Sequence, residues 1–440
     1  MKIEITNQGK WHQSLTLKLA LLAFMGIVFM IPLEMIKSII NERQTNADKV
    51  KMEISDQWAS RQVISGPVLN IPVKMIPADK NEKPTVLIWH ILPEVLDING
   101  RIDPEIRYRS IYQSVVYRSD LVIKGEFIIP GKGMLENSEI QWDAAYFTLG
   151  ISDNRGLKGE VRLETISGNL QAEPGVRDQE IFSSGVSFRY PVSDTSSKIP
   201  FNISLNLAGS EAIFLTPLGK TTNAHLESSW TAPGFKGSFL PSGRIIDAKG
   251  FRADWVVTHL NRNFPQSWTG RAFNPSDSEF GLDLFLPVDH YQKSYRSARY
   301  GILFIALTFL VLIFLEITRK ENIHIFHYFL VSLGLVLFFS LLNSLSEQTG
   351  FNIAYLISSV ATILLITFFT ATLFRNKRTA LVVLSMLSIL YAFIYVLLTL
   401  NDYAYLAGNI GLFILLAAVM SLSGKMKIFK GEGEDIIRSE

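Results

Sequence analysis

Six long apolar runs constrain this chain more than any other feature of its sequence. Five of them crowd into about the last 140 residues, and the sixth lies near the N-terminus, with about 260 residues of mixed composition between. A helix needs roughly 20 apolar residues to cross the hydrocarbon layer, because no water is present there to bond to free backbone groups. We therefore predict a polytopic α-helical membrane protein with six transmembrane helices. The fold class includes a large β-rich extracytoplasmic domain inserted between helices 1 and 2.

The first predicted transmembrane helix covers residues 15–35. A cleaved signal peptide is the alternative, but no small-x-small cleavage site follows the apolar run, which favours an uncleaved anchor. The other five form a predicted bundle over residues 300–422, and the last of them is the weakest because two glycines interrupt it. These five spans are Tyr300–Ile317, Phe326–Leu345, Ile353–Leu373, Ala380–Leu400 and Tyr405–Leu422.

The positions of Lys and Arg in short loops predict the orientation, because cations beside a span resist translocation. The loops 346–352 and 401–404 contain neither Lys nor Arg. Both termini, residues 1–14 and 423–440, are then cytoplasmic, and the long insertion is periplasmic in a bacterial inner membrane. The cations on the predicted cytoplasmic side are Lys2, Lys10, Lys18, Arg319, Lys320, Arg375, Lys377, Arg378, Lys425, Lys427 and Lys430.

The insertion begins with a helical pattern and then changes to a strand pattern. Apolar residues recur three or four apart through Trp58, and Gly66-Pro67 is a stop signal, so we predict a juxtamembrane helix over residues 36–65. Its apolar stripe is covered by the domain or by a second copy of the chain, and a domain-packing role is favoured. Residues 66–298 are the predicted β-rich domain, which is antiparallel and sandwich-like or otherwise dominated by sheet. Its clearest strand-like segments are Thr85–Leu92, Ser114–Ile123, Gly125–Ile129, Gly159–Leu163, Phe201–Leu207 and Glu279–Leu286.

Composition excludes several function classes. The formal net charge of +2 is too small to indicate nucleic-acid binding, and the basic residues are spread over the loops. The chain has no cysteine, which excludes disulfides, thiolate metal sites and a cysteine nucleophile. It also lacks a Walker A loop, a Gly-x-Ser-x-Gly elbow and a His-Glu-x-x-His zinc motif.

Several motifs in order resemble those of one bacterial family. They are Gly66-Pro67-Val68-Leu69-Asn70-Ile71-Pro72, Gly150-Ile151-Ser152-Asp153-Asn154-Arg155-Gly156, Arg262-Asn263-Phe264-Pro265-Gln266, the run 286–294 (LPVDHYQKS) with 300–305 (YGILFI), and the run 345–355 (LSEQTGFNIAY). Together they resemble the inner-membrane CreD family over essentially the whole chain. The resemblance implies an envelope protein linked to cell-envelope integrity and to a two-component stress regulon. It supplies neither a reaction nor a catalytic residue.

Polar residues inside or bordering spans are the only candidate site residues that we single out. They are costly in hydrocarbon, and they are Asn343, Glu347, Glu316 and Asp402. Asn343 and Glu347 lie four apart, so they share a helical face if the span continues through Ser346. No ionisable group lies near the middle of several spans, as a proton or ion path requires.

Two histidine motifs each allow a structural and a functional interpretation. Asp289 and His290 are adjacent, so on a strand they point to opposite faces, and an interfacial belt of aromatic and cationic side chains is the favoured interpretation. His324 and His327 have metal-compatible helical spacing but no third ligand, which favours a structural pair. We predict no catalytic, cofactor-binding or metal-binding residue.

The favoured function is non-enzymatic support of the cell envelope, in which the periplasmic domain binds an unidentified envelope component. The alternative is a transporter or lipid-handling protein that works through its helix bundle, and an unrecognised enzyme is a third class. An enzyme requires a polar cluster that forms only in three dimensions, for example Asp153 with Asp289 and His290 around one cleft. The expected partners are membrane lipids and the envelope component, without nucleic acid, and a homo-oligomer is left open.

Overall fold

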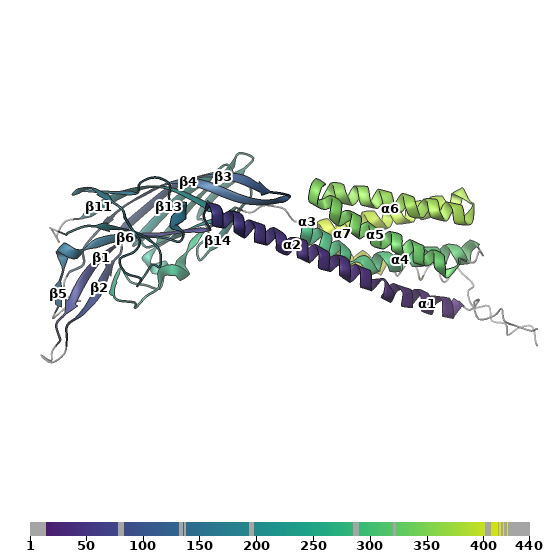
Figure 1. The fold of residues 1–440 in the computed structure, drawn as a ribbon, viewed down its shortest axis with the longest axis horizontal. Helices are drawn as coiled ribbons and strands as arrows, with labels where there is room; N and C mark the ends of the chain where they lie inside the picture. Colours follow the sequence, from purple (N-terminus) through teal and green to yellow (C-terminus); the bar gives the residue numbers. More distant parts are fainter. Residues whose placement is uncertain are drawn as a thin grey trace, which may run out of the picture. The chain divides into compact units, whose positions relative to one another are not determined.

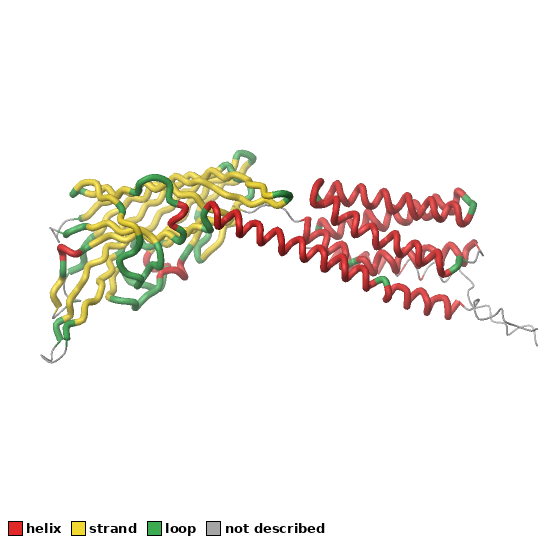
Figure 2. Tube along the Cα trace, in the orientation of Figure 1, coloured by secondary structure: helices red, strands yellow, loops and turns green. Residues whose placement is uncertain are grey.

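The computed structural model describes residues 15–77, 83–131, 135, 138–192, 198–284, 290–319 and 323–400, together with 406–411, 413, 414, 417 and 420. The chain divides into two compact units. The helical unit consists of Met1–Thr45 and Val288–Glu440, and the β unit consists of Asn46–Pro287. Figure 2 distinguishes the two by colour, with red helices in the first and mostly yellow strands in the second.

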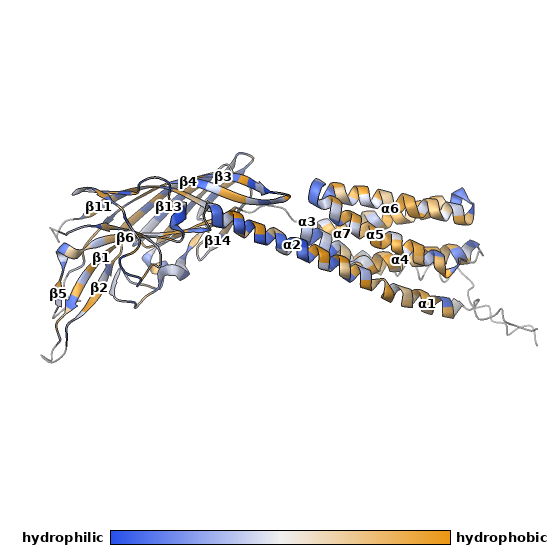
Figure 3. Cartoon of the chain, in the orientation of Figure 1, coloured by the Kyte–Doolittle hydropathy of each residue, from blue (hydrophilic) through white to orange (hydrophobic). Residues whose placement is uncertain are grey.

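Seven α-helices lie between Leu15 and Thr399 in the described residues, and five candidate membrane spans lie among them. Figure 3 shows the apolar colouring of α4 to α7 and the change along α2 from apolar to hydrophilic residues. The helices are α1 (Leu15–Val28), α2 (Met30–Trp58), α3 (His290–Arg299), α4 (Gly301–Arg319), α5 (Ile325–Thr349), α6 (Phe351–Phe374) and α7 (Lys377–Thr399). The four C-terminal helices therefore match four predicted spans closely.

Eight of the 18 residues of the sixth predicted span, Tyr405–Leu422, lie outside the described residues, and so does Asp402. The ten residues of this span that the structure describes, between 406 and 420, are helical. The exact number of six transmembrane helices therefore stays a prediction. The terminal segments 1–14 and 423–440 also lie outside the described residues.

The first predicted span is interrupted between α1 and α2. Pro32 has no N–H to donate to the carbonyl of Val28, four residues earlier, and its ring would clash with that carbonyl in a regular helix. The helix α1 accordingly ends at Val28, and α2 begins at Met30. Backbone hydrogen bonds from Phe29 to Met25 and from Leu33 to Phe29 still connect the two helices, at 3.0 and 3.4 Å.

The predicted juxtamembrane helix is wrong over residues 59–65. Helix α2 ends at Trp58, the last member of the apolar period, and strand β1 (Gln62–Met75) begins soon after it. Gln62 to Ser65 pair with strand β12 (Ala212–Thr216), so backbone bonding to a sheet replaces the helix. Gly66 and Pro67 lie inside β1, where Gly66 has φ +117°, a value that side-chain-bearing residues rarely adopt.

The β unit consists of two sheets (Figure 1). The ten-stranded sheet has the path β14-β18-β12-β1-β6-β10-β9, with β2 and β5 also paired to β1 and with β17 paired to β2. Its other strands are β2 (Thr85–Ile91), β5 (Ser138–Ile140), β6 (Tyr146–Ile151), β9 (Glu173–Pro174), β10 (Gly185–Arg189), β14 (Pro233–Gly237), β17 (Ser267–Thr269) and β18 (Phe280–Leu284).

The eight-stranded sheet has the order β15-β16-β13-β3-β4-β11-β7-β8. Its strands are β3 (Val95–Arg109), β4 (Tyr112–Phe127), β7 (Arg162–Thr165), β8 (Gly168–Gln171), β11 (Ile199–Ser210), β13 (Thr221–Ser228), β15 (Gly243–Asp247) and β16 (Gly250–Thr258). One hydrophobic cluster takes residues from both sheets, including Trp89 and Phe147 from the first and Leu121 and Trp255 from the second. The two sheets therefore share a core, as the sandwich prediction requires.

The pairing within these sheets differs from the prediction in two respects. The predicted all-antiparallel arrangement has two exceptions, because β1 pairs with β12 and β3 pairs with β13 in parallel. The predicted segments Ser114–Ile123 and Gly125–Ile129 are not separate strands, because Gly125 lies within the ladder of β4, which continues to Phe127. Parallel partners come from segments far apart in the sequence, which local periodicity does not reveal.

The end of the β-rich region also differs from the prediction of residues 66–298. The last strand of the described residues ends at Leu284, and residues 290–299 form helix α3, which belongs to the helical unit. Tyr291, Ser294 and Ala298 are buried along this helix, at spacings of three and four residues. A short amphipathic helix thus takes the place of the last part of the predicted β-rich domain, and the interfacial belt stays a prediction.

Candidate functional site

A row of polar and aromatic side chains crosses the ten-stranded sheet of the β unit. His90 on β2 pairs directly with Asn70 on β1 and with Trp268 on β17, and Asn70 pairs in turn with Tyr146 on β6. Directly paired residues project from the same face of a sheet. Trp89 and Ile91, the neighbours of His90 on β2, project from the other face.

His90 is completely buried and has a hydrogen-bond partner at each ring nitrogen. Its Nδ1 lies 2.7 Å from Oδ1 of Asn70, and its Nε2 lies 3.0 Å from Oε2 of Glu180. Asn70 is held by its own donations to the carbonyl of Val68 at 3.3 Å and to Oγ1 of Thr148 at 2.8 Å. Burial lowers the pKa of His90 below its usual value, against the neighbouring carboxylates, which raise it.

Two carboxylates reach this row from the loop between β9 and β10. Asp178 accepts a hydrogen bond from the Tyr146 hydroxyl at 2.6 Å and one from the backbone N–H of Glu180 at 3.1 Å. Burial and the adjacent Asp178 carboxylate raise the pKa of Tyr146, so its hydroxyl stays a donor. The same loop also packs onto β6, where a Cβ at Gly150 would come within 2.8 Å of the Phe182 ring.

His90, Asp178 and Glu180 are a group that could hold a metal ion, because one ligand atom from each lies within 4.8 Å of the others. None of the three residues is predicted as a ligand from the sequence. His90 lies in an ordinary strand pattern, and the carboxylates come from an irregular loop some 90 residues later. The loop carries no metal-binding motif, so only the fold brings the three side chains together.

A second feature of the β unit is a set of cations around Trp58, at the C-terminal end of α2. The guanidinium carbons of Arg107 and Arg118 lie 5.1 and 5.6 Å from the ring centroid, and Nζ of Lys158 lies 5.9 Å from it. The Trp58 Nε1–H donates to the carbonyl of Tyr117 at 3.3 Å, which fixes the ring against strand β4. We call Trp58 and these three cations the Trp58 patch.

Most of the negative charge near the Trp58 patch is already paired. Glu105 is 3.0 Å from Arg107, and Glu53 on α2 is 2.7 Å from Arg109, which follows on the same hairpin. In the part of the chain that the structure describes, no ion pair joins Arg118 or Lys158 to a carboxylate. Both side chains belong to exposed residues. The patch therefore offers cationic and aromatic groups to a partner from solution.

The Gly150–Gly156 motif forms a joint between the end of α2 and the sheet. Asp153 accepts hydrogen bonds from Ser60 N at 2.9 Å and from Arg155 Nη2 at 2.7 Å. Arg155 in turn donates to the carbonyl of Asp56 at 2.7 Å. The guanidinium of Arg155 holds the pKa of Asp153 well below its usual value. These contacts give Asp153 a structural role.

The Arg262–Gln266 motif is also structural. The buried Arg262 donates to the carbonyl of Phe264 at 2.9 Å and to those of Leu218 and Gly219 at 3.3 Å each. Its guanidinium also contacts the Gln266 side-chain oxygen. Burial lowers the pKa of Arg262 to about 10, still far above neutrality, so the side chain remains a cation that ties loops together.

Glu316, one of the predicted polar residues of the helical unit, contacts side chains of two other helices. Glu316 forms an ion pair with Lys18, and it accepts a hydrogen bond from the Tyr328 hydroxyl at 2.8 Å. Lys18 also donates to the carbonyl of Ile323 at 2.6 Å. A further acid near the end of the first predicted span, Glu34, pairs with Lys37 at 2.6 Å.

Asn343 and Glu347 share a helical face only if the helix continues through Ser346. Helix α5 does so and ends at Thr349. Glu347 is 3.8 Å from Arg43, while Oδ1 of Asn343 is buried without a hydrogen-bond partner among the described residues. Next to them, the Ser346 hydroxyl lies 3.4 Å from that of Ser294 on α3. This group therefore connects α2, α3 and α5.

The two histidine motifs give no catalytic site in the described residues. His324 caps α5, because its Nδ1 accepts a hydrogen bond from Phe326 N at 3.2 Å, and the His327 ring lies 5.7 Å from that of Phe369. Asp289 and the side chain of His290 lie outside the described residues. The hypothesis of a cleft shared with Asp153 is thus untested.

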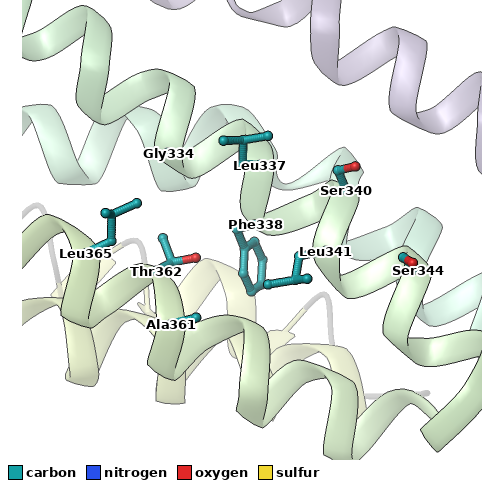
Figure 4. Close-up of a pocket in the computed structure, with 9 residues that line it drawn as sticks. All are labelled: Gly334, Leu337, Phe338, Ser340, Leu341, Ser344, Ala361, Thr362 and Leu365. Atoms are coloured by element: carbon teal, nitrogen blue, oxygen red, sulfur yellow. The ribbon is translucent and has the colours of Figure 1, made fainter.

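Cavities in the helical unit have mainly apolar linings. One of about 370 Å³ lies between α5 and α6, and Figure 4 shows Phe338, Leu341 and Leu365 among its lining side chains. Another, of about 520 Å³, lies between α6 and α7 and includes three tyrosines, Tyr355, Tyr391 and Tyr395. Neither cavity is lined by a charged residue.

The fold and these sites define a protein with several helices able to cross a membrane and with a large two-sheet unit that has its own core. The chain matches the family described as Inner membrane protein CreD over residues 14–428. It is also 30% identical to the Inner membrane protein CreD of Escherichia coli (strain K12) over 406 residues, which cover 90% of this chain and 89% of the relative. The chain therefore belongs to the CreD family of inner membrane proteins.

Proposed function

We propose that this protein supports cell-envelope integrity by binding an anionic envelope component, without catalysis, through the Trp58 patch of its β unit. The single observation that carries the proposal is the convergence of Arg107, Arg118 and Lys158 on one aromatic ring. Arginine and lysine favour phosphate and carboxylate partners, and an indole adds a flat apolar surface. Phosphate-bearing lipids and carboxylate-bearing glycans both have this chemistry.

Such a partner requires the β unit to lie outside the cytoplasm, and that topology is part of the proposal. The distribution of Lys and Arg supports it, because residues 346–352 contain none, whereas the connection from α6 to the first turn of α7 contains Arg375, Lys377 and Arg378. Long translocated domains do not obey the charge rule, so the many cations of the β unit are compatible with this side.

Capture from the intact cell tests the proposal. A photoreactive residue at Tyr108, which is 69% exposed on the β3–β4 hairpin next to Arg107, is expected to crosslink a phosphate- or carboxylate-bearing envelope molecule. The double variant R118E/K158E is expected to reduce that capture at least tenfold, because repulsion replaces attraction. Arg244→Glu on strand β15, an exposed cation outside the patch, is the matched control and should leave capture unchanged. Equal capture by the double variant would contradict the proposal.

The transporter or lipid-handling alternative has one observation in its favour, the cavity of about 520 Å³ between α6 and α7. Its apolar lining suits an acyl chain better than an ion. Ser359→Leu, which fills the cavity from the α6 side, should abolish function under this alternative and leave it intact under the binding proposal. The same envelope-integrity assay therefore distinguishes the two.

A further inference from the structure

The orientation of the Asn70 amide determines which ring nitrogen of His90 carries hydrogen. Only the amide nitrogen of Asn70 can donate to the Val68 carbonyl, at 3.3 Å, so the amide oxygen faces His90. Nδ1 of His90 lies 2.7 Å from that oxygen and must be the donor. In the neutral imidazole the other nitrogen, Nε2, then carries a lone pair.

That lone pair faces a carboxylate. Nε2 of His90 lies 3.0 Å from Oε2 of Glu180, and a carboxylate has only acceptor sites. Two acceptors at this distance are reconciled by a positive charge that both can bind, which is either a proton or a metal ion. The Asp178 carboxylate is the third group here, and one oxygen of each acid and Nε2 lie within 4.8 Å of one another.

We propose that His90, Asp178 and Glu180 bind one divalent transition-metal ion of the Zn²⁺ type. Zinc accepts histidine nitrogen and carboxylate oxygen at about 2.0–2.2 Å, which places neighbouring ligand atoms about 3.3 Å apart in a tetrahedron. One nitrogen and two oxygens suit zinc or manganese better than magnesium or calcium, which prefer oxygen alone. The proposal replaces the sequence-based expectation of no metal site.

The surrounding residues have the arrangement of an outer coordination shell. A metal-bound histidine usually donates its other ring N–H to an oxygen, and Asn70 supplies that oxygen. Ligating carboxylates are usually held by hydrogen bonds, and the Tyr146 hydroxyl holds Asp178 at 2.6 Å. Asn70 and Tyr146 are themselves neighbours on β1 and β6, so the rigid sheet orients both.

The site has a route to solvent and an evident structural consequence. The Glu180 side chain is 22% exposed, whereas His90 is fully buried, so an ion enters from the loop side. Three protein ligands leave one position for water. Two of the ligands come from the loop between β9 and β10 and one from β2, so the metal fixes this loop on the sheet.

The test uses the full chain in detergent, purified without a histidine tag, treated with a chelator and then dialysed against Zn²⁺. We expect about one zinc per chain in the unmodified protein by elemental analysis, and a higher Tm in the presence of Zn²⁺. Glu180→Gln and Asp178→Asn keep the side-chain shape and should each weaken zinc binding by at least 100-fold. Tyr146→Phe removes only the hydrogen bond to Asp178 and should weaken it by about 10–100-fold.

Glu173→Gln is the matched control, because Glu173 belongs to the adjacent strand β9 and pairs with Arg177 rather than with His90. It should bind zinc as the unmodified chain does. Two results would overturn the proposal. One is the absence of stoichiometric binding of Zn²⁺ and of Mn²⁺ by the folded, unmodified chain, which would identify His90 and Glu180 as an imidazolium–carboxylate pair. The other is zinc binding that survives Glu180→Gln unchanged.

Discussion

The helical unit and the β unit treat their polar side chains in opposite ways. In the helical unit, Glu316 is enclosed by Lys18 and Tyr328, so charge is neutralised between helices. In the β unit, Arg118 and Lys158 are exposed and, among the described residues, contact the Trp58 ring rather than a carboxylate. Nε2 of His90 faces the Glu180 carboxylate, where we propose a bound metal ion. The proposed function accordingly assigns anchoring to the helical unit and recognition of other molecules to the β unit.

The largest expected effect concerns the side of the membrane on which each unit is exposed. The chain has no native cysteine, so a single engineered cysteine reports on its own position. Lys249→Cys in the β unit should react almost completely with a membrane-impermeant maleimide in intact spheroplasts. Lys377→Cys, at the first residue of α7, should react only after lysis. The reverse pattern would remove the basis for assigning envelope recognition to the β unit.

The next effect concerns the charged pair inside the helical unit. Glu316→Leu leaves the Lys18 ammonium, whose side chain is 13% exposed, without its carboxylate. Removing one partner of such a buried pair costs about 3–5 kcal/mol, so we expect a marked fall in Tm measured in detergent. The double variant K18M/E316L should recover most of the loss, because apolar residues can replace a buried pair. An unchanged Tm for Glu316→Leu would show that the pair does not stabilise this unit.

A smaller effect is expected at the joint of the β unit. The pKa of Asp153 is held low by Arg155, so its stabilising contribution is complete above the usual carboxyl pKa of about 4 and is lost as the pH falls through the lowered value. Asp153→Asn should therefore destabilise the chain by about 1–2 kcal/mol at pH 7, measured by urea unfolding. The difference should stay constant down to about pH 4 and shrink only in stronger acid. Glu160→Gln, an exposed acid near the same joint, should have little effect.

Much of the helical architecture follows from the sequence, because hydrophobic length alone requires helices in a membrane. Four C-terminal spans agree with α4 to α7 within a few residues. The end of α2 was misjudged because Gly66-Pro67 is a stop signal in any context, whereas the pairing of Gln62 with β12 depends on a strand some 150 residues away. Helix α3 was missed because its length is short and its composition resembles an interfacial belt.

The candidate sites were less predictable than the fold. Glu316, Glu347 and Asn343 were identified because charge and polarity are conspicuous in apolar runs. His90 and the cations around Trp58 were not, because such residues are ordinary in a soluble-looking region. Only the strand register places Asn70 beside His90, and only the loop fold brings Glu180 to them.

Complementation in a bacterium that lacks its own copy of the gene tests most directly whether the β unit or the helical unit carries the function. Survival under envelope stress is measured for R118E/K158E in the β unit and for N343A/E347Q in the helical unit, at equal amounts of protein in the membrane. The account predicts that the first variant loses protection and that the second retains nearly all of it. Loss of protection in N343A/E347Q with full protection by R118E/K158E would contradict it and place the function in the helices.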